Sequence, residues 1–402
     1  MIGLNKRVYR AVRAAAVCVL ALFFALSASL RAFSEEANVP QLSAHAACLY
    51  CANNGEFLVK LQSGERLPMA STTKIMTALL GLEADEKSGG MNVTVTPEMY
   101  AEGSSMYLAA GETLKMRDLV GGMMMVSGND AANAVALTVA GSREEFARMM
   151  NARAAEIGLH RTHFVTPSGL DADGHFTTAE ELALLMAYCM ENEAFASIER
   201  SASVTVDFVE PQGKTQTYYN ENKLLSRYDH CIGGKTGYTD KAGRTLVSCA
   251  EKDGVRLIAV TLNDPDDWDD HIALYDYGFE ACSMKKPEQS TAQYSTAVVG
   301  GEKESISLSA GEPPLVCTGS AGLLDVTVKC EAPQLLYAPV EKGQKVGFLR
   351  YYTGGVYAGK ADLTAAESVG ASGEATSFLE NTASFFRALS SRLKKHRSSP
   401  GK

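Results

Sequence analysis

The sequence predicts an α+β fold, because short apolar segments bounded by turn residues stand on both sides of a long helical block. The chain has 402 residues, of which 46% are hydrophobic, so it can bury a sizeable core and form more than one domain. Strands before and after the helices predict one sheet that is assembled from both ends of the segment.

The first strands are expected to form a hairpin. Residues 46–50 and 56–60 are apolar stretches, and the turn signal Asn53-Asn54-Gly55 separates them. A helix is expected next over residues 71–82. Its residues are apolar almost all round, which indicates burial on every side.

The helical block is expected to continue to about residue 194. Within it, Thr177 and Thr178 each stand three residues before a glutamate, which is the spacing of a capping box and predicts a helix start. Strands are then expected at residues 231–236, 245–250 and 255–262, followed by a helix over residues 271–279.

The distal part of the chain has a different texture. Short β-rich segments bounded by Gly or Pro predict a small all-β domain over residues 284–365, and a Gly, Ser and Ala stretch predicts a linker over residues 366–375. Residues 376–397 predict an amphipathic membrane-associating helix, because six apolar side chains fall within a stripe of about 120° opposite a polar and basic side. The alternative is a terminal helix packed on the protein. The six apolar residues are Phe378, Leu379, Phe385, Phe386, Leu389 and Leu393.

The charges are unevenly distributed. The formal net charge is −9, but residues 1–31 and 381–402 together carry eleven basic and no acidic side chains, so the rest carries −20. This acidic body argues against a nucleic-acid partner, because neutralising phosphates requires clustered Lys and Arg. Residues 1–34 have the basic, apolar and small-residue order of a signal peptide, with an apolar run shorter than the roughly 20 residues of a bilayer span. We therefore expect export from the cytoplasm, with an uncleaved anchor as the alternative.

Nine cysteines are present. Disulfides can form outside the cytoplasm, but a chain of this length does not need them for its core. Cys48 and Cys51 have C-x-x-C spacing without a second such pair, so most thiols are expected to be small buried apolar groups. Cys317 and Cys330 are a candidate disulfide.

The tetrapeptide Ser71-Thr72-Thr73-Lys74 places a hydroxyl and an amine about one helical turn apart. Ser71 is expected at the helix N-terminus, where free N–H groups and the dipole favour a developing alkoxide. A serine needs a base, and a lysine is a base only when neutral, a state that burial and a neighbouring cation both favour. On its own, this tetrapeptide more often marks a capped helix with a solvated lysine.

Two further tripeptides complete the pattern. Ser127-Gly128-Asn129 is expected in a turn between two helices, where a hydroxyl and an amide could face one cleft. Lys235-Thr236-Gly237 is expected at a strand, where a cation and a hydroxyl could face a substrate carboxylate while the glycine permits close backbone approach. Each tripeptide is a weak signal by itself.

Together the three motifs, with serine-to-serine and serine-to-lysine spacings of 56 and 108 residues, form the set found in β-lactamases and penicillin-binding proteins. The sequence resembles the serine D-alanyl-D-alanine carboxypeptidases, the low-molecular-mass penicillin-binding proteins, strongly over residues 40–282. The resemblance implies a penicillin-binding-protein/β-lactamase-like transpeptidase domain with an antiparallel sheet and a helical block, then the small all-β domain and the C-terminal amphipathic helix. The supporting stretches are residues 70–77, 127–133, 166–171 and 233–239.

The resemblance also implies the roles of the site residues. Ser71 would attack the carbonyl between the two terminal D-alanines of a peptidoglycan stem peptide, Lys74 would take its proton, and Ser127 would relay a proton to the leaving D-alanine. β-Lactams would be covalent inhibitors, and neither a metal nor a cofactor is implied. The implied substrate-binding residues are Asn129 for the peptide backbone, Lys235, Thr236 for the terminal carboxylate, Gly237, and Tyr238 with its backbone N–H in the oxyanion hole.

This sequence departs from the family pattern at two places. Many relatives have His or another residue where Tyr238 stands, which a backbone donor tolerates. Residues 263–271 contain no arginine where several relatives place one to help hold the terminal carboxylate. Arg244 is a candidate substitute, with a solvated loop arginine as the alternative interpretation.

Three other functions share parts of this pattern. A serine β-lactamase would need a Glu-x-x-Leu-Asn loop, which the sequence lacks, and a catalytically silent cell-wall-binding protein would lack a nucleophile. A metal-dependent D,D-peptidase would need clustered ligands, for which the candidates are His160, His163, His175, Asp171 and Asp173.

Overall fold

The computed structural model describes residues 39–289, 292–320, 322, 325–373, 384 and 387. The signal peptide expected at residues 1–34 lies outside the described residues, as does nearly all of the amphipathic helix expected at residues 376–397. Among the helices that the structure describes, none combines the length and the apolar character that crossing a membrane requires.

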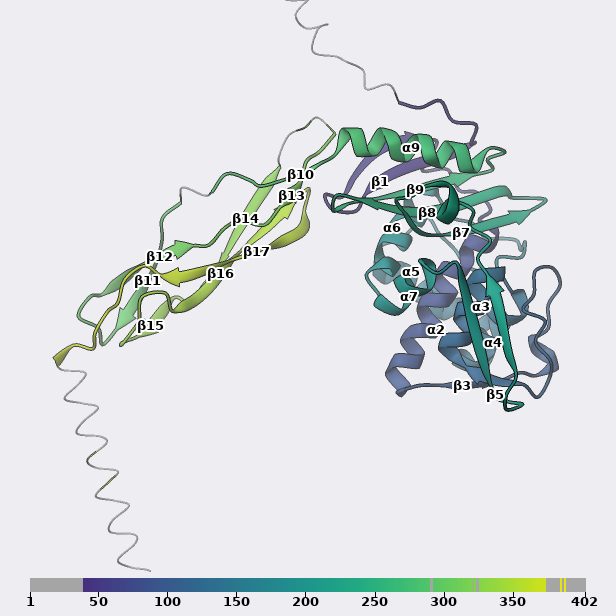
Figure 1. Ribbon diagram of the computed structural model, residues 1–402, viewed down its shortest axis with the longest axis horizontal. Helices are drawn as coiled ribbons and strands as arrows, with labels where there is room; N and C mark the ends of the chain where they lie inside the picture. Colours follow the sequence, from purple (N-terminus) through teal and green to yellow (C-terminus); the bar gives the residue numbers. More distant parts are fainter. Residues whose placement is uncertain are drawn as a thin grey trace, which may run out of the picture. The chain divides into compact units, whose positions relative to one another are not determined.

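Within the described residues, an antiparallel sheet with the strand order β2-β1-β9-β8-β7 forms the centre of the region that precedes residue 284 (Figure 1). Strand β1 pairs with β9, with Cys48 opposite Val260, so strands from both ends of the segment share one sheet, as the sequence predicts. The five strands are β1 (Ala46–Cys51), β2 (Glu56–Leu61), β7 (Cys231–Thr239), β8 (Gly243–Lys252) and β9 (Val255–Leu262).

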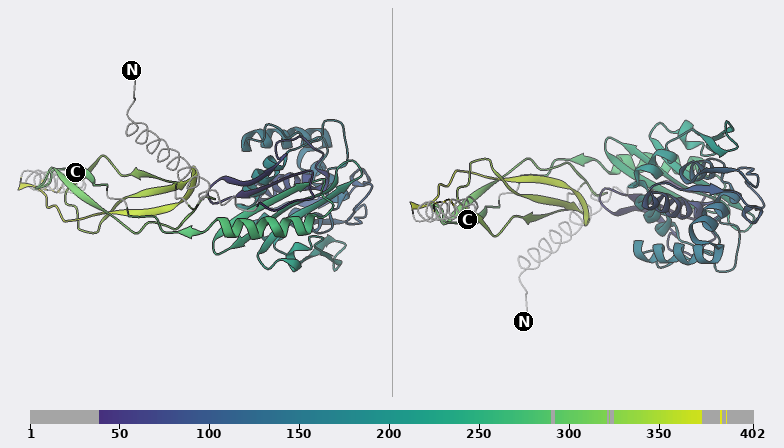
Figure 2. Two further views of the ribbon diagram at one scale, coloured as in Figure 1. Left: turned by 90° about the horizontal axis from the view of Figure 1, so that it is seen from above. Right: turned by 90° about the horizontal axis from the view of Figure 1, so that it is seen from below.

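Side-chain alternation in β1 divides the core between the two faces of this sheet. Cys48 and Tyr50 pack into the core that the sheet shares with the helical block, whereas Leu49 and Cys51 pack into the core beneath α9 (Asp267–Ala281). Figure 2 shows the α9 face from above and the opposite face from below. Helix α9 begins four residues before the expected start, because the aspartates in its first turn suit a helix N-terminus.

The helical block covers the second face. Helix α6 begins after Thr178, whose side chain accepts a hydrogen bond from the backbone N–H of Glu181, so the second of the two candidate capping threonines is the cap. The elements are the 3₁₀ turn η1 (Ala70–Thr73) and the helices α2 (Lys74–Ser88), α3 (Met116–Val126), α4 (Asn129–Ala140), α5 (Arg143–Ile157), α6 (Ala179–Met190) and α7 (Glu193–Glu199).

A second sheet, with the order β3-β4-β5-β6, was not predicted from the sequence. It supports the edge of the cleft described below, because the hydroxyl of Tyr218 on β6 donates to the carbonyl of Met106 at 3.0 Å. Its strands are β3 (Asn92–Thr94), β4 (Thr113–Lys115), β5 (Ser203–Glu210) and β6 (Thr215–Tyr219). The short helix η2 (Pro97–Met99) lies between β3 and β4 in the sequence, and α8 (Leu224–Arg227) follows β6.

The distal region is all-β, as expected. Within the described residues its main sheet has the order β14-β16-β17-β12-β11-β15, and β10 pairs with β13. Val369, which lies in the segment expected to be a linker, is buried and forms a bridge with Val340. The strands are β10 (Met284–Lys285), β11 (Tyr294–Val299), β12 (Ser305–Ala310), β13 (Val316–Cys317), β14 (Val326–Glu331), β15 (Leu335–Tyr337), β16 (Lys345–Thr353) and β17 (Val356–Ala365).

The cysteine pairing suggested by the sequence is wrong. Cys330 is exposed on β14 while Cys317 is buried beside Cys51. The two cysteines are 13 residues apart in sequence, but they belong to different strand pairings, and only the three-dimensional arrangement reveals that the neighbour of Cys317 is a residue of β1.

Candidate active site

Ser71 lies in η1, immediately before α2. The preceding residue, Ala70, has a φ of 46°, an unusual value for a residue with a side chain, and such strain is typical of functional sites. Gly169 packs behind this turn with a φ of 87°, and a Cβ there would overlap the carbonyl of Ala70. The loop around residue 169 therefore holds the turn that presents Ser71.

Lys74 is fully buried at the start of α2, with its Nζ surrounded by three oxygen atoms. Nζ lies 2.8 Å from Ser71 Oγ, 2.7 Å from Asn129 Oδ1 and 2.6 Å from the carbonyl oxygen of Ser168. Burial, and secondly the charge of Lys235, lower the pKa of Lys74 well below its ordinary value. A neutral amine has two N–H donors and one lone pair, so it can donate to Asn129 and Ser168 while accepting the proton of Ser71.

Ser127 is the C-cap of α3, with a φ of 58°, and it lines the same cleft as Ser71. Two residues on, Asn129 begins α4. Its Oδ1 accepts from Lys74, its Nδ2 donates to the carbonyl of Glu102 at 2.8 Å, and its backbone N–H donates to the carbonyl of Ser104 at 2.7 Å. Asn129 thus connects the base to the loop that borders the cleft.

The Lys-Thr-Gly motif lies on β7, and its lysine is buried. Burial lowers the pKa of Lys235 to about 8, although Glu221 and Glu199 partly oppose the shift. Its Nζ donates to the carbonyl of Thr236 at 2.8 Å. Thr236 itself faces the cleft.

Gly237 is where β7 approaches the nucleophile most closely. A Cβ at this position would lie 2.9 Å from the backbone nitrogen of Ser71 and would overlap Thr245 Oγ1. The absence of a side chain therefore keeps the N–H of Ser71 accessible from the cleft, beside Tyr238.

Glu199 was not identified from the sequence. It is buried at the end of α7, and its carboxylate accepts a hydrogen bond from the backbone N–H of Gly234 at 2.7 Å. Burial raises the pKa of Glu199 to about 7. A lone glutamate at the end of a helix carries no motif, so only its position behind β7 reveals this contact.

Arg244 lies on β8 directly opposite Tyr238 and lines the cleft. Its guanidinium donates to the buried carboxylate of Asp267 at 2.5 Å and lies over the ring of Trp268. Arg244 thus lies on a strand rather than in a loop and makes this ion pair at the cleft, while 43% of its side chain remains exposed to solvent.

The histidines and aspartates of residues 160–175 do not form a metal site among the described residues, where the cysteines treated below are the group with suitable geometry. Both ring nitrogens of His175 are used: Nδ1 accepts from the N–H of Val165 at 2.9 Å, and Nε2 lies 2.8 Å from the hydroxyl of Thr73. Since Thr73 donates its proton to Ala70, the His175 Nε2–H must donate to Thr73, and burial lowers the pKa of His175 to about 4. His175 is thus a neutral structural residue.

Regular strand alternation predicts that Cys231, four residues before Lys235, shares a face of β7 with it. A bulge breaks the alternation, because Cys231 lies opposite Ala250 while Gly233 lies opposite Cys249. Cys231 consequently lies on the α9 side of the sheet, so the expectation was wrong.

The structure thus divides the predicted site residues into two groups. Ser71, Ser127, Thr236, Gly237 and Tyr238 line one open cleft of about 340 Å³. Lys74, Asn129 and Lys235 lie buried behind it, where their polar atoms contact protein groups. Lys74, Asn129 and Lys235 can therefore act on a substrate through the residues that line the cleft, or after small displacements of their own side chains.

Comparisons with known proteins agree with this arrangement. The family model described as D-alanyl-D-alanine carboxypeptidase matches residues 33–266, and that of the C-terminal domain of penicillin-binding protein 5 matches residues 282–371. The chain is 31% identical over 376 residues to the D-alanyl-D-alanine carboxypeptidase DacF of Bacillus subtilis, covering 90% of this chain and 95% of the relative. It is 32% identical over 367 residues to the D-alanyl-D-alanine carboxypeptidase DacC of Escherichia coli, covering 87% of this chain and 90% of that relative. Among solved structures, penicillin-binding protein 5 from Haemophilus influenzae superposes with a TM-score of 0.60 at 28% identity, covering 82% of this chain and 98% of that one.

Proposed function

The chain belongs to the D-alanyl-D-alanine carboxypeptidase family and is a serine peptidase of that activity, and on this premise we propose that Ser71 attacks the carbonyl between the terminal D-alanines of a peptidoglycan stem peptide. The observation that carries the proposal is the 2.8 Å separation of Ser71 Oγ from a fully buried lysine amine. This family membership favours the carboxypeptidase over the β-lactamase and the silent wall-binding protein considered above.

In the first step, the lone pair of Lys74 accepts the proton of Ser71 while Oγ bonds to the substrate carbonyl carbon. The carbonyl oxygen acquires negative charge, which the backbone N–H groups of Ser71 and Tyr238 stabilise. The bare backbone at Gly237 supports this role, because it leaves room for the substrate carbonyl beside the N–H of Ser71.

In the second step, the bond to the terminal D-alanine breaks and its nitrogen takes a proton. Ser127 relays that proton, assisted by the positive charge of Lys235, and Ser127 is recharged from the ammonium of Lys74. Water then attacks the acyl-enzyme, giving up its proton through the same groups, and regenerates Ser71. The position of Ser71 and Ser127 in the lining of one cleft supports this route.

The terminal carboxylate of the substrate binds between Thr236 and Arg244. Both residues line the cleft with Ser71, and a guanidinium can bind a carboxylate through two parallel hydrogen bonds. Asn129 has both ends of its amide engaged, so it binds the substrate backbone only by exchanging the contact with Glu102, and its constant role is to hold Lys74.

Mass spectrometry after exposure to penicillin tests the proposal, because the modified peptide identifies the nucleophile. We expect one penicilloyl adduct on the peptide that contains Ser71. Ser71→Ala should remove the adduct and lower D-alanine release by about 10⁶-fold. The matched control Ser305→Ala, at an exposed serine of β12, should retain both. An adduct on another residue, or one that persists in Ser71→Ala, would contradict the mechanism.

Export and membrane association are part of the same proposal. They rest on the signal-like order of residues 1–34 and on the Phe-rich amphipathic pattern of residues 376–397. Deleting residues 378–402 should move the exported protein from the membrane fraction to the soluble fraction without changing penicillin acylation. Unchanged fractionation would favour the packed terminal helix instead.

A further inference from the structure

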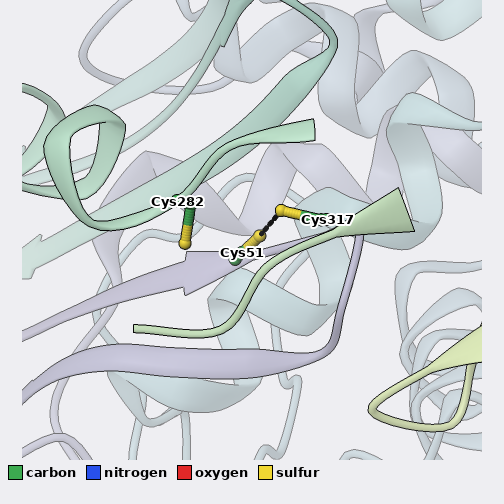
Figure 3. A group of neighbouring side chains, drawn as sticks. All are labelled: Cys51, Cys282 and Cys317. Carbon is green, nitrogen blue, oxygen red and sulfur yellow. Dashed lines mark hydrogen bonds between the residues drawn. The ribbon is translucent and has the colours of Figure 1, made fainter. Parts of the chain in front are cut away.

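Three cysteines that are distant in sequence gather at one point of the structure. Cys51 ends β1, Cys282 follows the last residue of α9, and Cys317 lies in β13. All three are buried, their sulfur atoms lie within 4.8 Å of one another, and the Sγ atoms of Cys51 and Cys317 are 3.6 Å apart. Figure 3 shows these side chains converging from three separate segments.

The spacing of the sulfur atoms fits a metal ion. Thiolates bound to zinc at about 2.3 Å in tetrahedral directions lie roughly 3.8 Å from one another, and the observed spacings span that value. A disulfide would use two of the sulfurs and leave the third as a buried thiol beside the bond, whereas a metal ion uses all three.

We propose that Cys51, Cys282 and Cys317 bind a thiophilic d¹⁰ cation, Zn²⁺ or Cu⁺, as thiolates. Both ions prefer soft sulfur ligands; Cu⁺ is satisfied by three, and Zn²⁺ takes a fourth ligand such as water. The thiols release their protons to solvent as the ion binds, and no oxidant or reductant takes part. The site is separate from Ser71 and the peptidase reaction does not require it.

The surroundings indicate a structural role. Next to the cluster, the side-chain amide of Asn54 in the β1–β2 turn donates to the carbonyl of Thr318 at 2.9 Å, and the hydroxyl of Thr353 donates to the carbonyl of Cys317 at 3.2 Å. A bound ion would add three strong bonds where the end of β1, the end of α9 and β13 meet. Since the ion binds only the folded arrangement, it would raise the stability of the protein.

The C-x-x-C spacing on β1 offers a matched control. Cys48 and Cys51 lie three residues apart on one strand, so their side chains point to opposite faces, and Cys48 packs into the other core. Cys48→Ala therefore removes one buried thiol of the same strand without touching the cluster.

The test is titration of the reduced full chain with Zn²⁺ alone and, separately and without oxygen, with Cu⁺ alone, each against a competing chelator. We expect one tight equivalent of one of these ions in the wild type and in Cys48→Ala, and loss of that tight phase in Cys51→Ala, Cys282→Ala and Cys317→Ala. The bound ion should raise the unfolding midpoint of only those proteins that retain the site. Penicillin acylation of Ser71 verifies that each variant is folded. A negative result of the metal titration therefore does not affect the peptidase assignment.

Two results would overturn the metal site. One is that neither ion binds tightly to the reduced wild type that is still acylated by penicillin. A disulfide between two of the three cysteines in the untreated protein would then explain their proximity instead. The other is tight binding that survives in the three cluster variants, because the ion would then lie elsewhere.

Discussion

The catalytic cleft and the distal β domain differ in what they bury. Behind the cleft, Lys74, Lys235 and Glu199 are buried, and burial displaces the pKa of each from its ordinary value. In the described residues of the β domain, the buried polar groups are hydroxyls of threonines and of Tyr351, and no charged side chain is buried. Burying a charge costs several kcal/mol, so the residues behind the cleft are held at a cost in stability that the β domain avoids. The difference indicates that the chemistry depends on the first region and that the second can vary without affecting it.

Lys74 should show the largest contrast between the two regions. Lys74→Ala removes the general base, so we expect the rate of acylation by penicillin to fall by about 10² to 10⁴. The exposed Lys342→Ala in the β domain should leave the rate unchanged. Stopped-flow acylation measures both, and near-wild-type acylation of Lys74→Ala would mean that another group activates Ser71.

Glycine positions sharpen the comparison at the level of the backbone. Gly237→Ala introduces a Cβ against the nitrogen of Ser71, so it should obstruct one oxyanion donor and lower kcat/KM by about 10² to 10³. Gly373→Ala meets open space and should have no effect. Hydrolysis of a D-alanyl-D-alanine peptide gives both values, and equal activities would show that the N–H of Ser71 stays accessible without a glycine at position 237.

Arg244 tests how the cleft holds the substrate. Arg244→Gln should raise KM roughly 10- to 100-fold, the loss of one or two charge-assisted hydrogen bonds, with a smaller change in kcat. Asp267→Asn keeps the arginine and removes the negative charge of its buried partner, so it separates the effect of substrate binding from that of the structural ion pair. An unchanged KM in Arg244→Gln would mean that Thr236, and not Arg244, binds the terminal carboxylate of the substrate.

The pH dependence follows from Lys235. Its pKa of about 8 in the folded state predicts that kcat/KM falls about tenfold per pH unit above pH 8, as the cation is lost. The free energy of unfolding should change with pH in the opposite sense. The folded state favours the neutral amine of Lys235, so the contribution of this group to stability is fully present above the unfolded pKa of 10.5 and is lost as the pH falls through 8. Comparing the wild type with Lys235→Met isolates this contribution in denaturant unfolding. A stability difference that decreases from pH 8 to pH 10.5 would contradict the assigned shift.

The parts of this molecule that the sequence predicts well have a local signal. The β1–β2 hairpin, α2 and strands β7 to β9 follow from turn residues and apolar patterns, and the three motifs single out Ser71, Ser127 and Thr236, which line the cleft. In the β3-β4-β5-β6 sheet, β3 and β4 have only three residues each, too few to display an alternation. Strand β5 has eight residues in which Val204, Val206 and Phe208 alternate with polar positions, so this strand was predictable from the sequence.

What the sequence could not supply is contact between distant residues. The carboxylate of Glu199 behind Gly234, the ion pair of Arg244 with Asp267, and the cluster around Cys51 each join segments whose proximity only the fold creates. The bulge at Cys231 shows the same limit on a small scale, because one extra residue reverses every later position of a strand.

The smallest expected effect on activity concerns the β domain itself. Leu349 on β16 is fully buried in the apolar core of that domain, so Leu349→Ala should lower the free energy of unfolding by about 2 to 5 kcal/mol. Leu79→Ala on α2 creates a comparable cavity in the core that carries Lys74. If the chemistry depends on the first region alone, Leu349→Ala should keep the wild-type acylation rate at temperatures where it remains folded, while Leu79→Ala should slow acylation by loosening α2. Acylation rates measured beside circular-dichroism melting separate the two variants, and a slow Leu349→Ala would show that the β domain contributes to the geometry of Ser71.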